Sequence, residues 1–176
     1  MISHFMCAVA VSSSIPGQHP SVFHSFCKVG TGYTMNELHE LDQLLHPHWR
    51  PFDTKRPPET VILAPGYKEK PDVWIEPTKS KIVQVKAAEI ITSDKFKTGV
   101  TLRFPRVEAI RKDKMWYECL SSTELEKLKS DQRVLFQDVL YRQRKVLYSS
   151  FGISAVSEME ANGSYFCITQ IRKRDS

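Results

Sequence analysis

Residues 102–114 read LRFPRVEAIRKDK, and this stretch decides the fold. The apolar and β-branched run that leads into it from Val100 predicts a strand that ends before Pro105. Charged side chains gather around that strand end: Arg103, Arg106, Arg111, Asp113 and Lys114. Guanidinium groups are planar forks that fit phosphate oxygens, and lysine adds a compact point charge. The stretch therefore predicts a phosphate-binding surface, and its charge suits a triphosphate as well as a nucleic-acid backbone.

Basic residues are concentrated around this stretch. Lys79 to Lys114 contains ten Lys or Arg against four Asp or Glu, whereas the whole chain of 176 residues carries a net charge of only +5. Interleaved aromatic and β-branched residues indicate that the charges decorate strands. A basic sheet face suits a polyanionic partner, although on charge alone a solvated face without a partner is an equal alternative.

Short apolar runs predict strands on both sides of this stretch. Two of them, 3–11 and 21–29, are expected to pair as a hairpin, and two more are expected to form a second hairpin through the turn 77–80. The predicted strands are Ser3–Val11, Ser21–Val29, Asp72–Glu76, Lys81–Ile91 and Val100–Phe104. The proline-rich segment 50–71 predicts a long irregular connection.

Two capping boxes predict helices. Thr34 and Glu37 have the required spacing, and the leucines that follow recur on one helical face for about three turns. Ser121 and Glu124 repeat the pattern before Leu125. Short strands around one helix, without strand–helix–strand alternation, predict a mainly β fold, a small β-barrel.

The remaining features carry little chemistry. The four cysteines are scattered without C-x-x-C spacing, so we expect free thiols rather than zinc or disulfides. No run approaches the ~20 apolar residues that cross a bilayer. Residues 132–148 fit an amphipathic helix, and residues 149–176 show no firm periodicity.

The central stretch also resembles a known motif. RFPR at Arg103–Arg106, followed by R-x-D-K at Arg111–Lys114, resembles motif VI of the ATP-dependent DNA ligases. Residues 73–77 and 83–90 look like the strands that precede motif VI. Within the family, residues 3–5, 20–24 and 33–38 resemble the DNA ligase IV branch.

The resemblance implies a fold and its limits. Residues 1–129 would form the family's OB-fold domain, with one or two helices and without the first strand that family members place upstream of Ser3. Residues 130–176 remain an unassigned tail that is expected to be partly helical. No K-x-D-G, the family motif whose lysine becomes adenylylated, occurs in these 176 residues, so we expect the chain alone not to form the adenylate.

The resemblance also implies roles for individual residues. Arg111 and Lys114 would contact the β- and γ-phosphates of ATP, with Asp113 orienting them, while Arg103, Arg106 and Lys86 would bind nucleotide or DNA. ATP and Mg²⁺ would serve the complete enzyme, with no metal ligand in this chain. DNA, a nucleotidyltransferase domain and end-joining scaffold proteins would be its partners in the nucleus, where it would join double-strand breaks by non-homologous end joining.

Purely structural roles are the alternative for these residues. The arginines could pair with neighbouring carboxylates, and Trp74, Phe104 and Trp116 are expected to pack in the core rather than to stack on bases. The alternative function is a non-catalytic OB-like module that binds nucleic acid.

Overall fold

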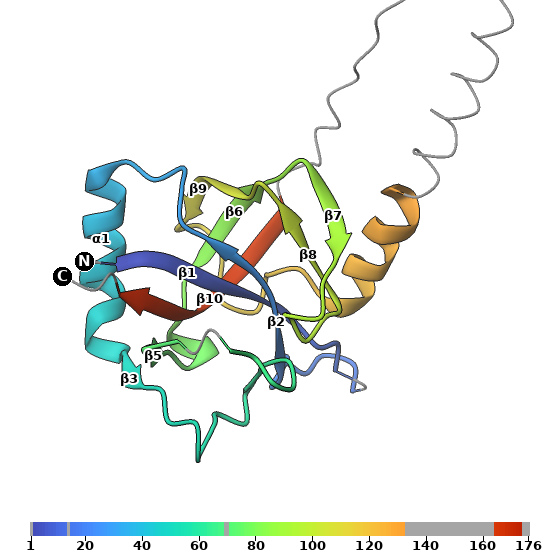
Figure 1. Cartoon of the computed structure of the whole chain (residues 1–176), viewed down its shortest axis with the longest axis horizontal. Coiled ribbons are helices and arrows are strands. Elements are labelled where there is room, and N and C mark those ends of the chain that lie inside the picture. The colour runs from blue at the N-terminus through green and yellow to red at the C-terminus, as the bar shows by residue number, and fades with distance from the viewer. Residues whose placement is uncertain (1, 14, 69–70, 133–163, 174–176) are drawn as a thin grey trace, which may run out of the picture.

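β1 (Ile2–Ala10) lies at the centre of the larger sheet, with an antiparallel strand on each side (Figure 1). β2 (Phe23–Val29) pairs with one edge and β10 (Ser164–Lys173) with the other. This computed structural model describes residues 2–13, 15–68, 71–132 and 164–173. β1 is also buried on both faces, because side chains that alternate between the two faces over residues 5–10 are each at most 5% exposed.

The alternation of β1 side chains divides the core into two clusters. Phe5, Cys7 and Val9 point into the larger cluster with α1 and β6 residues, whereas Ala8 and Ala10 join a smaller one. Successive strand residues face opposite sides, so a strand that is buried on both faces must be apolar at nearly every position. The sequence of β1 meets that demand.

β10 is paired along both of its edges. Opposite β1 it pairs first with β6 (Ile82–Lys86) and then with β5 (Val73–Trp74). β6 leads on to β9 (Arg106–Arg111), and β5 leads on to β3 (Arg50–Pro51). A two-residue strand, β4 (Val61–Ile62), pairs in parallel with β2. Within the described part of the chain, β10 is the one strand that joins β1 to the β6–β9 pair.

A second, two-stranded sheet lies beside the first. β7 (Glu89–Thr92) and β8 (Val100–Arg103) form this antiparallel pair. Residues 122–132 are helical, and this helix packs near β7 in Figure 1. The amide of Gln132 bonds both backbone groups of Ile90: it accepts from the N–H at 2.9 Å and donates to the carbonyl at 3.0 Å.

α1 (Met35–Leu45) covers one end of the larger sheet. Its capping box forms as the sequence predicts: the Glu37 N–H donates to Thr34 Oγ1 at 3.2 Å, and the Thr34 N–H donates to Glu37 Oε2 at 2.8 Å. Leu41 and Leu45 are fully buried. A short 3-10 helix, His46–His48, follows directly, because Pro47 cannot extend the α-helical hydrogen bonding.

Most of the predicted elements are confirmed, and the mainly β, OB-like fold is the one observed. The hairpin of 3–11 with 21–29 forms as β1 and β2, and the helix at Thr34 forms as α1. The helix after Ser121 also forms, with the Glu124 N–H donating to Ser121 Oγ at 3.3 Å. No helix among the described residues is long and apolar enough to cross a membrane.

Two predictions about strands were wrong. The run 81–91 is not one strand, because the chain leaves β6 at Lys86 and begins β7 at Glu89 in the other sheet. Segments 72–76 and 81–91 do not form a hairpin with each other, because β10 pairs with both β5 and β6. β10 itself lies where the sequence showed no firm periodicity, and the helix predicted for 132–148 falls almost entirely outside the described residues.

Gly32 allows the chain to cross β9 at very close range. The N–H of Val107 donates to the carbonyl of Thr31 at 2.9 Å, which brings the two backbones together. A Cβ placed on Gly32 would lie 2.1 Å from the carbonyl oxygen of Val107. Gly32 also has a φ of +97°, in the region that favours glycine. In the sequence Gly30-Thr31-Gly32, Gly32 therefore allows the chain that follows β2 to pack closely against β9.

We predict that Gly32→Ala destabilises the protein much more than Gly17→Ala. Both glycines have positive φ, so both substitutions carry a backbone cost of ~1–2 kcal/mol. Only Gly32 would also collide with backbone, whereas Gly17 has nothing within 4 Å, so Gly32→Ala should cost a further ~1–3 kcal/mol. Urea unfolding of the two variants measures the difference. Equal losses would contradict the close contact with β9.

Candidate phosphate-binding site

An extra residue in β9 controls which side chains share a face. Gln84 of β6 lies opposite Ala109, but the next residue, Val85, lies opposite Val107, so Glu108 is the additional residue of a bulge. Residues five apart on a regular strand face opposite sides. With the bulge between them, Arg106 and Arg111 both point away from the core, and Val107 and Ile110 both pack against it.

The outer face of the β6–β9 pair is consequently polar and mainly basic. Arg106 lies directly opposite Lys86 in the ladder. Further along, the Gln84 amide donates to Glu108 Oε2 at 2.7 Å and accepts from Arg111 at 3.1 Å. Gln84 thus ties the bulge residue to the arginine at the strand end.

The turn that follows β9 holds the first group of predicted site residues, here called the turn cluster: Arg111, Asp113 and Lys114. The guanidinium of Arg111 grips the Asp113 carboxylate with two bonds, Nε to Oδ1 at 2.8 Å and a terminal nitrogen to Oδ2 at 2.6 Å. A backbone bond from the Lys114 N–H to the Arg111 carbonyl, at 3.4 Å, closes the turn. Asp113 and Gln84 together fix the plane of the Arg111 fork.

The electrostatics of this turn follow from the same contacts. The hydrogen bonds from Arg111, aided by the charges of Arg111 and Lys114, lower the pKa of Asp113 from 3.8 to about 2. Its carboxylate therefore stays ionised at neutral pH and orients a permanently charged guanidinium. The Nζ atom of Lys114 lies 3.9 Å from Oε1 of Glu118, and the Lys114 side chain is 22% exposed.

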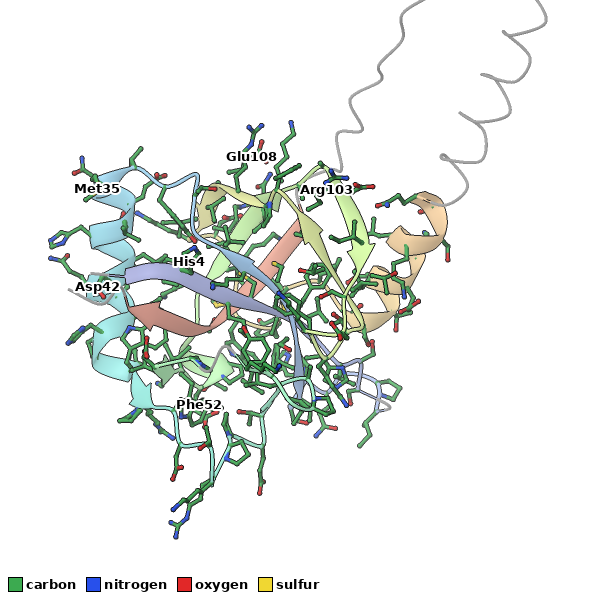
Figure 2. The ribbon with its side chains drawn as sticks, in the orientation of Figure 1. His4, Met35, Asp42, Phe52, Arg103 and Glu108 are labelled. Atoms are coloured by element: carbon green, nitrogen blue, oxygen red, sulfur yellow. The ribbon has the colours of Figure 1, made fainter. Side chains whose placement is uncertain are left out.

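The other end of β9 holds a second group, here called the tip cluster: Lys86, Arg103, Phe104 and Arg106. Arg103 at the end of β8 donates to Glu89 of β7 at 2.7 Å, directly across the strand pair. Figure 2 shows Arg103 and Glu108 along the same upper edge of the molecule. The guanidinium of Arg106 makes no hydrogen bond or ion pair with the described residues, and the side chain is exposed.

Phe104 does not pack in the core, contrary to the sequence prediction. Its side chain is 75% exposed, the most of any large hydrophobic residue described. Its φ of 52° is the only positive value among the described non-glycine residues, and such a conformation costs ~1–3 kcal/mol. The tight connection between β8 and β9, with Pro105 next in the chain, holds the ring outward beside the Arg103 guanidinium, 5.2 Å from the ring centroid.

Trp74 and Trp116, the two tryptophans expected in the core, fit that prediction in part. Trp116 is half-buried and packs against the smaller core cluster, with its ring 6.2 Å from that of Phe23. Trp74 is also half-buried, but the Arg50 guanidinium lies 5.6 Å from its ring. Neither ring belongs to the two clusters of the candidate site.

The structure groups the six predicted site residues by the end of β9 at which they lie. Arg111, Asp113 and Lys114 are together at its end, and Lys86, Arg103 and Arg106 are together at its beginning. Sequence reasoning missed Gln84 and the exposure of Phe104. An aromatic residue directly before a proline, within a basic stretch, was the available sequence signal for Phe104. Within the described residues, no three His, Cys, Asp or Glu side chains are arranged to hold a metal ion.

Comparison with known proteins shows the family to which the chain belongs. The family described as "ATP dependent DNA ligase C terminal region" matches residues 1–114. The chain therefore belongs to the C-terminal region of the ATP-dependent DNA ligases. It resembles DNA ligase 4 of Gallus gallus, with 53% identity over 130 residues, covering 74% of this chain and 14% of the relative.

Other relatives carry the same name. DNA ligase 4 of Homo sapiens is 53% identical over 129 residues, covering 73% of this chain and 14% of the relative. DNA ligase 4 of Dictyostelium discoideum is 53% identical over 105 residues, which are 59% of this chain and 10% of the relative. The chain thus spans about one seventh of the length of the first two relatives.

We predict that the pKa of Asp113 depends on Arg111. In the unaltered chain the carboxyl should titrate at about 2, and Arg111→Ala should return the midpoint toward 3.8. Because its pKa is lower in the folded state, Asp113 stabilises the folded state at pH values above its unfolded pKa of 3.8. This stabilisation is lost as the pH falls through about 2. Carboxyl chemical shifts in a nuclear magnetic resonance titration report the midpoint.

Arg103→Ala is the matched control, because it removes an arginine from the other end of β9. It should leave the Asp113 midpoint unchanged. An Asp113 midpoint near 3.8 in the unaltered chain would contradict the two-bond contact with Arg111.

Proposed function

We propose that this chain supplies the C-terminal OB-like part of a DNA ligase IV-like enzyme, which joins DNA ends in double-strand break repair by non-homologous end joining. The observation that carries the proposal is the fixed Arg111 fork beside Lys114, at the positions of the family's R-x-D-K. ATP, DNA, a nucleotidyltransferase domain and end-joining scaffold proteins are the partners we assign to the complete enzyme, and the nucleus is its location.

The turn cluster is suited to the first chemical step. In that step a lysine nitrogen forms a bond to the α-phosphorus of ATP, and the bond to the pyrophosphate oxygen breaks. Negative charge grows on the leaving pyrophosphate, and cations already fixed in position stabilise it without reorganisation. Arg111 is fixed by Asp113 and Gln84, so it presents its charge at low entropic cost.

Asp113 is a positioning residue in this proposal. Its carboxylate fixes the orientation of the Arg111 guanidinium, while Lys114 adds a second positive charge. Mg²⁺ would neutralise phosphate charge in the complete enzyme. We assign it no ligand in this chain.

The tip cluster is suited to DNA. Lys86, Arg103 and Arg106 offer cations to phosphates, and phosphate contacts carry no sequence information. Phe104 adds an exposed apolar ring among these charges, where it can contact a sugar or a base. The two clusters lie roughly 17 Å apart along β9, at about 3.4 Å per residue, so they can act on different phosphates.

We predict that Arg111→Ala or Lys114→Ala, made in a complete ligase that contains this chain, lowers self-adenylylation by about a hundredfold or more. Loss of one charge-stabilising group at a transition state has that size. Sealing of DNA that already carries a 5′-adenylate should suffer much less, because that step releases no pyrophosphate. Radiolabelled AMP transfer and nick sealing measure the two steps separately.

Lys127→Ala is the control for loss of a lysine, because Lys127 is exposed on the helix 122–132, outside both clusters. It should leave both steps unchanged. Equal losses in both steps for Arg111→Ala would show a structural role or a DNA-binding role instead. That result would favour the alternative of a non-catalytic module that binds nucleic acid.

A further inference from the structure

The strand that completes the sheet comes from outside the part of the chain that resembles the ligases. The family match covers residues 1–114, and the Gallus gallus relative aligns over 130 residues. β10 begins at Ser164, yet all three of its partner strands lie within the matched part. The sheet of the ligase-like region is thus completed by a segment with no counterpart in that match.

β10 fills the gap between β1 on one side and β5 and β6 on the other, and this gap is here called the lane. Cys167 lies opposite Ala8 of β1 on one edge and opposite Ile82 of β6 on the other. Gln170 likewise lies between Met6 of β1 and Trp74 of β5. Without β10, the described strands of the larger sheet would separate into three groups: β1–β2–β4, β6–β9 and β3–β5.

The cost of an empty lane is large for a domain of this size. β1 is buried on both faces, and its free edge would leave backbone groups without hydrogen-bond partners close to the core. β6 would lose its second neighbour at Val83 and Val85, which are at most 3% exposed. The lane therefore demands an extended strand.

The sequence of β10 suits that demand. SYFCITQIRK is rich in aromatic and β-branched residues, the types enriched in strands. Residues 166–168 are apolar in succession, a pattern typical of strands inside a sheet rather than at its edge. The backbone register with β1 extends over Ile2 to Ala8, nearly the whole of that strand.

We propose that the lane between β1 and the β5–β6 side is an acceptor site for an extended antiparallel peptide, which the C-terminal segment of the same chain fills in cis. The ligand class is a strand of about eight to ten residues with consecutive apolar positions, and main-chain hydrogen bonds supply most of the recognition. The ligase-like region depends on that strand for its fold.

The first test cuts the full chain without removing any residue of β10. A protease site inserted in 133–163 is cleaved after folding, and the products are separated by size exclusion under native conditions. The C-terminal piece should stay with the body, at the mass of one chain, 20.3 kDa before insertion of the site. Release of the piece from a body that stays folded would overturn the proposal, and so would a dimer that exchanges the strand between copies.

The second test weakens the strand itself. Ile168→Pro removes the backbone N–H of the β10 residue that lies opposite Cys7 of β1 and disfavours the extended strand there, whereas Ser157→Pro, outside β10, is the matched control. Hydrogen exchange of β1 amides should accelerate at least tenfold in Ile168→Pro and stay unchanged in Ser157→Pro. Unchanged protection in both variants would contradict the proposal.

Addition of a synthetic peptide with the sequence of residues 164–173 separates a lost strand from general misfolding. Millimolar peptide, present during refolding of Ile168→Pro, should restore β1 protection, because the lane would be filled in trans. A peptide with the same composition in scrambled order is the control. If the authentic peptide gives no more recovery than the scrambled one, the lane is not an acceptor site.

Discussion

The ladder between β6 and β9, with its single extra residue at Glu108, is the constraint on which the candidate site depends. It places the Val107 and Ile110 side chains in the core and leaves Arg106 and Arg111 on the outer face. One residue fewer would turn one of the two arginines inward. A buried guanidinium without a partner is costly, so the bulge and the basic face require each other.

The same ladder connects the site to the rest of the fold. The Val107 N–H of β9 donates a hydrogen bond to the carbonyl of Thr31, beside Gly32, where no side chain would fit. β6 is held on its other edge by β10. Rigid support on both sides keeps the two clusters at a fixed separation, which their proposed roles toward phosphates require. The turn cluster adds its own local support through Asp113 and Gln84.

Sequence reasoning reached the fold and the site to different depths. The capping box at Thr34 and the alternation in 21–29 are local signals, so α1 and β2 could be predicted from residues close in sequence. The grouping of Arg111, Asp113 and Lys114 was also local, because all three lie in one turn. Their roles remain predictions.

Non-local features escaped the sequence analysis. The bulge at Glu108 depends on the register with β6, which no local pattern reveals. The break between β6 and β7 arises because the two strands belong to different sheets, although the run from 81 to 91 is continuously strand-like. β10 was missed because its consecutive apolar residues lack alternation, and because its partners lie at least 79 positions away in the sequence, from Ser164 to Val85. The ring of Phe104 was expected inside the core, and only the backbone of the β8–β9 connection shows why it points outward.

The central claim is that the two ends of β9 serve different phosphates, and the salt dependence of duplex DNA binding tests it most directly. The affinity of the full chain should fall linearly on logarithmic axes as salt rises, because phosphate contacts release counterions. Arg106→Ala should reduce that slope by about 0.9, the loss of one phosphate contact, whereas Arg111→Ala should leave the slope unchanged. Equal reductions in both variants, or binding that does not respond to salt, would contradict the account.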